Sequence, residues 1–477
     1  MTLERSLRVP PPASAPPKAP RGSERDDAIH HHPGICSTAL LVIATRHHTG
    51  FRRGLLIFGA CHLFRFIQSP RNSCTSFGKK TCSVDLERDT RLRSLIDGCR
   101  DFAEFEQVLA DRLKFSPGRD AILFIDESQE SRQLGRFVRF MKEDWRDATV
   151  ILSGSTLSRL FRDDVRYPVG RVQQLVVSPF SFSEYLVAVG ESPLAAFVRG
   201  DELPVTPARH ERLLELFDGF LGTGGLPAAV LAHTAGHDHR ELLAQIAADY
   251  ERDFIRIFGE RDADIVTACF RSVANFVGSP SKNTTVIPAP GTTINARINQ
   301  VFARLQAWHL VLRSDQKGPS PDSSHAYLPK RYLFDTGLLR HFRELGMPSI
   351  NVLRTRSAAA RGPLGGGLEN QVAVELARGG APLCGWKKTP SGGEIDFLVT
   401  RKRKTVPVEC KASLTLDGRS FRGIADYLHE YDQPLGVIVS FAAYGITEIV
   451  APGSRRKRRI VMLPAPLLER LNAIIDA

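Results

Sequence analysis

The clearest pattern of apolar and polar positions lies between residues 121 and 156. Residues 121–125, AILFI, form a short, fully apolar run, which is typical of a strand buried on both faces of a parallel sheet. An amphipathic helix is predicted next, because apolar residues recur at spacings of three and four at Leu134, Phe137, Val138 and Met141. A second apolar strand follows at residues 149–152. Strand, helix and strand in this order predict a right-handed βαβ unit of an α/β fold.

Polar residues follow both strands and are candidates for chemistry. Asp126 and Glu127 come directly after the first strand, and Ser153 ends the second. The carboxyl ends of parallel strands form the edge at which open α/β sheets bind ligands. A hydrophobic strand followed by Asp-Glu is the Walker B pattern, in which Asp126 would order Mg²⁺ through water and Glu127 would polarise the attacking water. Ser153 would then sense the γ-phosphate of ATP. The alternative is an ordinary parallel strand that ends in two acids.

The segment before this unit lacks the phosphate-binding loop that such a site requires. Residues 55–58 predict a first core strand, which Gly59 follows as the expected start of the loop. In the register G-x-x-x-x-G-K-[ST] that begins at Gly59, the chain has Phe64, Arg65 and Phe66 at the three critical positions. Bulky side chains prevent the close backbone approach through which amide hydrogens bind phosphates. The expected cofactors of this site are ATP and Mg²⁺. Because the phosphate-binding loop is not intact, we expect binding of ATP to be impaired.

A second compact pattern begins at residue 368, beyond a glycine-rich hinge predicted at residues 362–367, within the domain expected at residues 360–477. The pattern predicts a helix at residues 368–376 and then three strands at 383–387, 394–399 and 406–411. A second helix at 421–431 and a strand at 435–440 follow. This order, with Asp396 and a Glu-x-Lys at Glu409 and Lys411, resembles the PD-(D/E)xK nuclease core. In that family, an acidic residue on the first helix completes the site, and Glu369 stands at the corresponding position.

The spacing of these charged residues places them on one face of adjacent strands. Because side chains alternate along a strand, Asp396 is expected to face the same way as Glu409 and Lys411. The resemblance implies Glu369, Asp396 and Glu409 as metal ligands, whose hard oxygens suit Mg²⁺. Lys411 would orient water and neutralise the charge that develops on the scissile phosphate. The alternative is a half-exposed sheet whose outer face carries solvated charges.

The charge of the chain favours a polyanionic partner. The 477 residues carry a net charge of +12, and the excess is concentrated at 401–404 and 455–459, two runs expected to flank the predicted metal site. Basic patches of this kind favour DNA as a partner. Eight cysteines without a C-x-x-C pair point to a reducing cytosol, and no apolar stretch near the N-terminus is long enough to span a bilayer. We therefore expect a cytoplasmic protein that binds no membrane.

Several motifs in a fixed order resemble one family. The chain reads IDE, LSGS, PVGRV, SPFSFSEYL and GTGGLPAAV, which is similar to bacterial and archaeal AAA-type ATPases with a C-terminal domain of unknown function 4143, related to restriction endonucleases. The resemblance implies an α/β fold with a P-loop AAA-type ATPase core, a helical and winged-helix middle segment and a restriction-endonuclease-like α/β domain. We expect a disordered or artefactual tail at residues 1–52, the ATPase core at 53–200 and a helical lid at 201–262. The winged-helix-like segment is expected at 263–350 and the nuclease-like domain at 360–477.

Two classes of function are compatible with these patterns. The first is an ATP-dependent enzyme that acts on DNA, and the complete set of Asp396, Glu409 and Lys411 favours it. The second is a non-catalytic DNA-binding or scaffold protein that retains both folds, which the missing phosphate loop favours. The sequence leaves open the DNA substrate, the oligomeric state, including a homo-oligomer, and whether residues 60–82 reflect a frame slip or degeneration.

Overall fold

The computed structural model describes residues 38–43, 81–119, 121–154, 160, 172–202, 205–282, 292–319, 327–343, 348–355, 358–389, 393–450 and 456–477. All of them belong to one of the two units of the chain, residues 33–477. Buried apolar residues form one core within residues 84–160, a larger one within residues 180–475 and a small one within residues 386–460.

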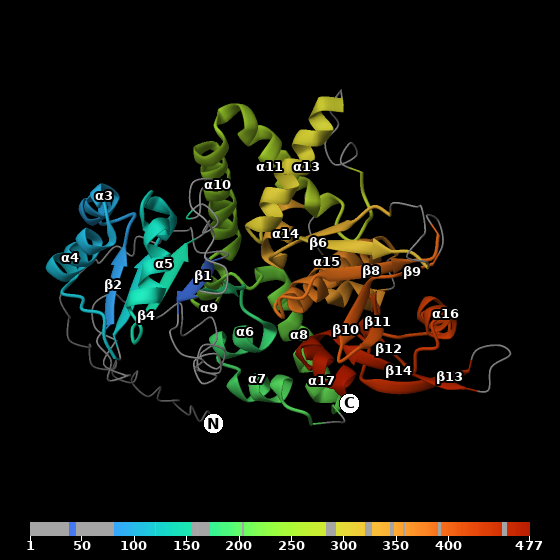
Figure 1. Cartoon of the computed structure of the whole chain (residues 1–477). Helices are drawn as coiled ribbons and strands as arrows, with labels where there is room; N and C mark the ends of the chain where they lie inside the picture. The colour runs from blue at the N-terminus through green and yellow to red at the C-terminus, as the bar shows by residue number, and fades with distance from the viewer. Residues whose placement is uncertain are drawn as a thin grey trace, which may run out of the picture. The chain divides into compact units, whose positions relative to one another are not determined.

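The first core surrounds a five-stranded sheet of order β2-β3-β4-β1-β5 (Figure 1). Its strands are β1 Thr38–Ile43, β2 Thr81–Asp85, β3 Ile122–Asp126, β4 Thr149–Gly154 and β5 Gln173–Val177. Its helices are α3 Thr90–Gly98, α4 Phe102–Leu113 and α5 Leu134–Asp144, with the short helix η2 at Ser128–Glu130. Strands β2, β3 and β4 are parallel, so β3, α5 and β4 form the βαβ unit that the apolar pattern predicts.

The apolar stripe of α5 packs into this core as predicted. Leu134, Phe137, Val138 and Met141 are all buried. The ring of Phe105 in α4 stacks on Phe137 with centroids 4.7 Å apart. Helices α3 and α4 are separate, because the side chain of Asp101 caps α4 by accepting the backbone N–H of Glu104.

Strand β1 lies within the segment expected to be a tail, and it runs against its neighbours. Its residues pair antiparallel with β4 and with β5. Leu40 pairs with Ser153, whereas Ile43, the carboxyl end of β1, pairs with Val150. The run TALLVI has the apolar and β-branched residues that favour a strand, so residues 38–43 are part of the sheet. The first core strand predicted at residues 55–58 lies outside the described residues.

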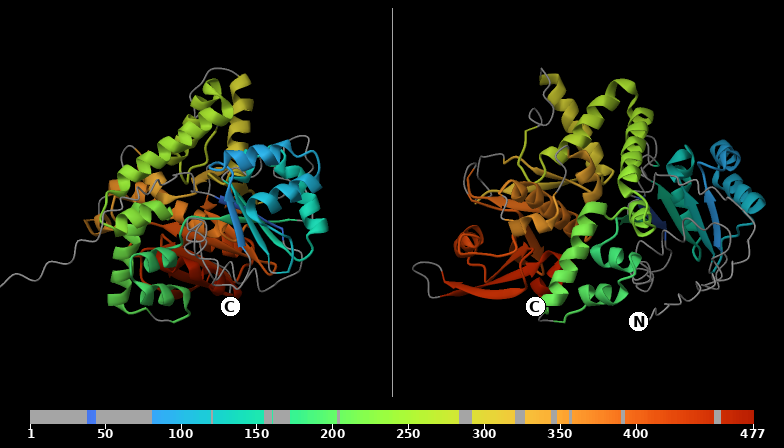
Figure 2. Two further views of the ribbon diagram at one scale, coloured as in Figure 1. Left: turned by 90° about the vertical axis from the view of Figure 1, so that its left-hand side faces the viewer. Right: turned by 180° about the vertical axis from the view of Figure 1, so that it is seen from behind.

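Helices dominate the middle of the chain. They are α6 Phe182–Ala188, α7 Ser192–Arg199, α8 Pro207–Thr223, α9 Pro227–Thr234, α10 His239–Phe258, α11 Glu260–Asn275, α13 Thr292–Ala307 and α14 Thr336–Phe342. Ser181 and Glu184 form a capping box at the start of α6, within the motif SPFSFSEYL. Helix α11 packs against α10 and α13 (Figures 1 and 2). Helix α13 buries an apolar face made of Ile298, Val301, Phe302 and Leu305.

Two further sheets carry the C-terminal half. One has the order β7-β6-β8-β9 and the other β10-β11-β12-β14-β13. The bounds are β6 Val311–Lys317, β7 Lys330–Leu333, β8 Leu383–Lys387, β9 Glu394–Ile395, β10 Phe397–Arg401, β11 Lys404–Lys411, β12 Leu435–Ser440, β13 Gly445–Val450 and β14 Lys457–Pro464. Helices η4 Ile350–Thr355, α15 Ala358–Ala377, α16 Arg422–Glu430, η5 Ala465–Arg470 and α17 Leu471–Asp476 complete this half. The order expected from residue 368 to residue 440 is present with one change: the strand expected at residues 394–399 is interrupted at Asp396, so that β9 belongs to the four-stranded sheet and β10 to the five-stranded one.

The four-stranded sheet crosses the domain boundary expected between residues 350 and 360. Strand β6 pairs parallel with β8, so strands from both sides of this boundary share one hydrogen-bond ladder. The residues expected to form a winged helix therefore contribute β6 and β7 to a sheet that the C-terminal strands complete.

The glycine-rich stretch at residues 362–367 is not a hinge but part of helix α15. Helix α15 contacts β6, β7 and β8 of one sheet and β11 of the other. A side chain at Gly366 would place its Cβ 2.8 Å from the side chain of Val277. The glycine therefore allows close packing within a helix, which sequence alone cannot distinguish from flexibility.

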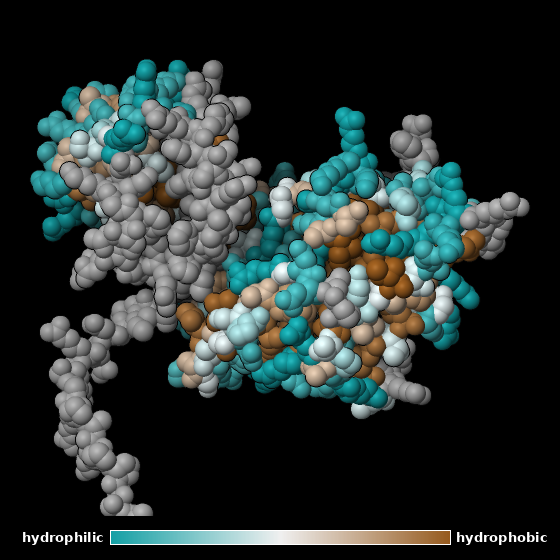
Figure 3. Space-filling view, turned by 90° about the horizontal axis from the view of Figure 1, so that it is seen from below, coloured by the Kyte–Doolittle hydropathy of each residue, from teal (hydrophilic) through white to brown (hydrophobic). Residues whose placement is uncertain are grey.

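The helices in the part of the chain that the structure describes do not combine the length and apolar character that a membrane-spanning helix requires. None of the helices there has an apolar stretch long enough to cross a bilayer. On the face shown in Figure 3, hydrophobic patches are interrupted by hydrophilic residues.

Candidate functional site

The first candidate site lies at the carboxyl ends of β3 and β4. Asp126 ends β3, and Ser153 stands one residue before the end of the neighbouring strand β4. The hydroxyl of Ser153 donates a hydrogen bond to Oδ1 of Asp126 at 2.5 Å. The backbone N–H of Glu127 donates to the same oxygen at 3.0 Å. In this arrangement the Ser153 hydroxyl orients the carboxylate of Asp126, and its predicted role as a sensor of the γ-phosphate stays a prediction.

Glu127 is held by a residue that the sequence analysis did not identify. The backbone of Glu127 has a φ of 47°, a left-handed conformation that turns the chain from β3 into η2. The amide of Gln129 donates a hydrogen bond to the Glu127 carboxylate. A Cβ at Gly154 would lie 1.8 Å from Oε1 of Gln129, so the glycine after Ser153 leaves room for this amide. Ser153 thus positions Asp126 directly, and Gly154 makes room for Gln129, which positions Glu127.

The electrostatics of this edge disfavour two ionised carboxylates. Burial raises the pKa of Asp126, although hydrogen bonds from Ser153 and from the backbone of Glu127 oppose the shift. Burial and the nearby charge of Asp126 raise the pKa of Glu127 to about 8. At neutral pH most Glu127 carboxyls therefore carry a proton, and a protonated carboxyl cannot accept a proton from water.

The other groups expected at this site lie outside the described residues. Gly59 and the segment where a phosphate loop was expected, residues 59–66, are among them. At the described edge, Asp126 offers carboxylate oxygens that suit Mg²⁺ held through water, with further ligands from the phosphates. The donor set therefore fits Mg²⁺ that arrives with a nucleotide.

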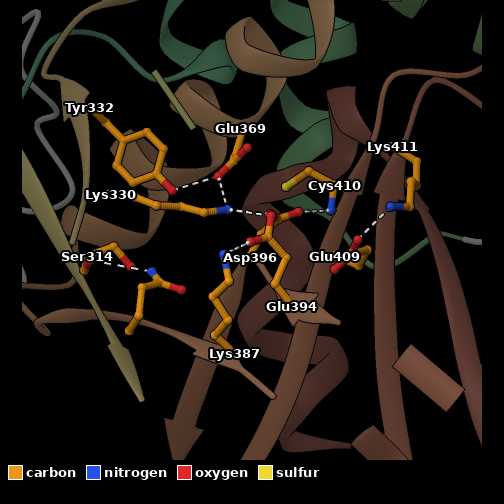
Figure 4. Close-up of polar contacts among 11 residues, drawn as sticks. Ser314, Lys330, Tyr332, Glu369, Lys387, Glu394, Asp396, Glu409, Cys410 and Lys411 are labelled. Carbon is orange, nitrogen blue, oxygen red and sulfur yellow. Dashed lines mark hydrogen bonds and ion pairs between the residues drawn. The ribbon is translucent and has the colours of Figure 1, made fainter. Parts of the chain in front are cut away.

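The second candidate site is built around Lys330, which comes from strand β7 (Figure 4). Its side chain is 0% exposed. Its ammonium lies 2.9 Å from Oε1 of Glu369 in α15, 2.8 Å from Oδ1 of Asp396 and 3.4 Å from Oε1 of Glu394. Two of the three predicted metal ligands, Glu369 and Asp396, are thus brought together as expected, but a lysine bridges them.

Hydrogen bonds fix the acids around Lys330. The hydroxyl of Tyr332 donates to Oε1 of Glu369 at 2.7 Å. The backbone N–H of Cys410 donates to Oδ2 of Asp396 at 2.9 Å. Lys387 pairs with the second carboxylate oxygen of Glu394 at 3.4 Å. Each carboxylate therefore has a second partner besides Lys330.

Glu409 and Lys411 lie beside this cluster, on β11, as strand alternation predicts. The ammonium of Lys411 donates to Oε1 of Glu409 at 2.6 Å. The other oxygen, Oε2 of Glu409, is buried without a hydrogen-bond partner. Burial and the charge of Asp396 raise the pKa of Glu409 to about 8. Lys411 therefore neutralises its own strand neighbour.

The charges of the cluster balance around one ammonium. Burial alone would lower the pKa of Lys330, but the carboxylates of Asp396, Glu369 and Glu394 raise it above its usual range. Burial and the charge of Asp396 raise the pKa of Glu369 to about 8. Lys330 thus stays charged, while crowding of acids keeps some carboxyls protonated at neutral pH.

The described residues do not assemble the predicted metal centre. Within them, no group of three or more His, Cys, Asp or Glu side chains is placed to hold a metal ion. The ammonium of Lys330 already occupies the space between Glu369 and Asp396. The donor set of Glu369, Asp396 and Glu409 therefore does not fit Mg²⁺ in this arrangement.

The basic runs do not flank this cluster, contrary to expectation. Arg401 pairs with Lys404 at the turn between β10 and β11, whereas Glu409 and Lys411 stand at the other end of β11. Strand β14, parallel to β12 and hence to β11, begins with the second run at Lys457. Both basic runs therefore lie where the parallel strands β11 and β14 begin. Glu409 and Lys411 lie where β11 ends, which is the opposite edge of the five-stranded sheet.

Many of these basic side chains are paired with acids of the chain itself. Arg401 contacts Asp476 at 3.0 Å, and Lys457 contacts Glu448 at 2.7 Å. Arg403, Lys404 and Arg459 are exposed. The basic surface is therefore smaller than the two runs suggest.

Lys330 and Gln129 are the residues that the sequence analysis missed. Lys330 precedes the apolar residues of YLF in a strand that is buried along its whole length, and a lysine in such a strand needs a buried acid. Gln129 lies two residues after Glu127, within reach of it in a tight turn.

Three known protein families match successive parts of the chain. An "AAA domain" family matches residues 74–186, a "Domain of unknown function (DUF8612)" matches residues 214–349, and a "Domain of unknown function (DUF4143)" matches residues 364–451. A search of curated proteins found no match to the chain. The match to the AAA domain begins after Gly59 and includes Asp126, Glu127 and Ser153. The chain therefore carries an AAA domain, which supports an ATPase-like function, followed by a C-terminal domain of unknown function (DUF4143).

Proposed function

We propose that the protein is an AAA-type ATP-binding protein that hydrolyses ATP poorly and associates with DNA without cutting it. The observation that carries the proposal is the bond from Ser153 to Asp126 across the ends of two parallel strands. It fixes one carboxylate at the edge where α/β sheets bind nucleotides and keeps its second oxygen available for water around Mg²⁺.

Poor hydrolysis is supported by the sheet itself. A phosphate loop follows a strand whose carboxyl end lies beside the acids. The strand next to β4 is β1, and its carboxyl end, Ile43, lies at the edge away from Ser153. The residues at Phe64, Arg65 and Phe66 also do not meet the loop pattern. Without a loop that positions the γ-phosphate of bound ATP, Asp126 and Glu127 do not meet a correctly placed substrate.

Association with DNA is supported by the exposed basic residues Arg403, Lys404 and Arg459. Their edge of the sheet lies away from Glu409 and Lys411. Duplex DNA held at this edge is not presented to the carboxylate cluster, which favours binding without cleavage.

Binding of ATP is tested with a fluorescent ATP analogue and the full chain. We expect Mg²⁺-dependent binding that Asp126→Asn weakens roughly ten- to hundredfold, as loss of a group that orients a metal's water does. Asp144→Asn, at the exposed end of α5, is the matched control and should bind like the unaltered chain. The proposal is contradicted if the unaltered chain does not bind the ATP analogue, or if Asp126→Asn and Asp144→Asn bind it with the same affinity.

A second candidate is an active Mg²⁺-dependent nuclease, favoured by the proximity of Asp396, Glu409 and Lys411. It requires cleavage of plasmid DNA that depends on Mg²⁺ or Mn²⁺ and is lost in Asp396→Ala, Glu409→Gln and Lys411→Ala. We expect the full chain to leave the plasmid intact with either metal. Metal-dependent cleavage that each variant abolishes would establish the second candidate instead.

A further inference from the structure

Lys330 has the contacts of a permanently bound cation. Its ammonium is fully buried and meets the carboxylates of Glu369, Asp396 and Glu394. A lysine ammonium has three N–H donors, and each can be directed at one of these three carboxylates. All of its hydrogen-bonding capacity is thus used by acids.

The surrounding structure holds Lys330 in place. Asn370, the neighbour of Glu369 on α15, accepts a hydrogen bond from the backbone N–H of Leu333 at 2.8 Å and donates one to its C=O at 2.9 Å. This pair of bonds joins α15 to β7, the strand that carries Lys330. Tyr332 also holds Glu369 from β7. The lysine and its acids are therefore fixed by two elements that are bonded to each other.

A divalent cation and this ammonium would compete for the same oxygens. Mg²⁺ requires carboxylate oxygens at about 2.0–2.1 Å, and it would use the oxygens of Glu369 and Asp396 that lie 2.9 and 2.8 Å from Lys330. Both cations cannot occupy the space between these two atoms, because their charges repel and their radii overlap.

We infer that Lys330 is the resident cation of this carboxylate site, so that the chain binds no divalent metal there, and that removal of the ammonium turns Glu369, Asp396 and Glu394 into a divalent-cation site. The inference concerns how the cluster is neutralised, and it does not rest on binding of ATP or DNA. Its test uses neither.

The experiment measures binding of Mn²⁺ to the full chain by electron paramagnetic resonance of free Mn²⁺, without nucleotide. All proteins carry Asp126→Asn, which removes the acid of the AAA domain expected to order a metal. We expect no Mn²⁺ binding that depends on Asp396 in this background. Lys330→Met should add one Mn²⁺ site per chain, and adding Asp396→Asn should remove it.

Lys387→Met is the matched control, since it removes a neighbouring ammonium that contacts the other oxygen of Glu394. It leaves Lys330 between Glu369 and Asp396, so it should create no Mn²⁺ site. Binding of Mn²⁺ that Asp396→Asn removes while Lys330 is present would overturn the inference. A folded Lys330→Met protein without a new site would also overturn it.

Thermal unfolding keeps the test decisive if Lys330→Met is unstable. Removal of one partner leaves buried carboxylates without compensation, so its midpoint should fall. Mn²⁺ should raise that midpoint and leave the midpoint of the Asp126→Asn protein that keeps Lys330 unchanged, because only the Lys330→Met protein has an open site. If Lys330→Met folds neither with nor without Mn²⁺, the inference is tested on the proteins that keep Lys330. Binding of Mn²⁺ to these proteins should then be the same with and without Asp396→Asn.

Discussion

The buried carboxylate of Asp335 accepts a hydrogen bond from the backbone N–H of Gly225 at 2.7 Å, across 110 residues of chain. Its other oxygen accepts the N–H of Leu338 at 3.0 Å and so caps α14. A Cβ at Gly224 would lie 2.4 Å from Asp335. The motifs GTGGLPAAV and YLFDTGLL, distant in the sequence, are therefore two sides of one contact.

Asp335→Asn should destabilise the protein. The amide nitrogen of asparagine would face an N–H donor of Gly225 or Leu338, so one buried hydrogen bond is lost at a cost of roughly 1–3 kcal/mol. We expect the midpoint of thermal unfolding to fall by a few degrees. The exposed substitution Asp144→Asn should leave the midpoint unchanged, and equal midpoints for the two variants would contradict this role of Asp335.

The same residue should make stability depend on pH. Burial raises the pKa of Asp335 from 3.8 to about 6. Because the folded state then binds more protons than the unfolded state between about pH 4 and 6, the stability contributed by this group falls as pH rises through that window. The shift corresponds to about 3 kcal/mol at most. Thermal unfolding from pH 4 to pH 7 should show an advantage over Asp335→Asn that shrinks up to about pH 6. An advantage that grows with pH would mean that hydrogen bonds to the ionised form outweigh burial.

ATP turnover by the purified full chain should not exceed background. The acids of the AAA edge lack a positioned phosphate, and Glu127 is largely protonated at neutral pH. Release of inorganic phosphate should therefore be the same for the unaltered chain and for Glu127→Gln. Fast turnover that Glu127→Gln abolishes would show that residues outside the described part hold the phosphates.

Binding of duplex DNA should weaken steeply with salt. Each phosphate neutralised by a basic side chain releases counterions, and the logarithmic slope changes by about 0.9 per contact. Charge reversal of Arg403, Lys404 and Arg459 to Glu should weaken binding and flatten the salt dependence. Reversal of Arg112, Arg119 and Arg146, exposed residues of the AAA domain, changes net charge equally and is the control. Equal losses from both triple variants would show that net charge alone attracts DNA.

Short-range patterns predicted the parts of the sites that lie on neighbouring segments. Asp396 directly precedes β10, next to the end of β11 that carries Glu409 and Lys411, because β10 and β11 are adjacent strands and alternation along each strand is local. The βαβ unit at Asp126 was predictable for the same reason. Such patterns say which residues point the same way on one strand, and they depend little on the rest of the fold.

The parts that were missed depend on pairing between distant segments. Lys330 reaches the cluster because β7 pairs with β6, and β6 with β8, and no periodicity specifies that order. The direction of β1 is likewise absent from its composition, since an apolar run fits either orientation in a buried sheet. Closeness in sequence also could not tell which edge of the sheet the basic run at 401–404 would occupy.

The pairing of β6 with β8 also has a consequence for how the chain is made. Ser314 of β6 pairs with Leu383 of β8, so the ribosome must add roughly 70 more residues before β6 obtains this partner. At about 5–20 residues per second, the edge of β6 waits on the order of 3–14 seconds during synthesis. Over that interval the edge of β6 that will pair with β8 is open to pairing with strands of other nascent chains.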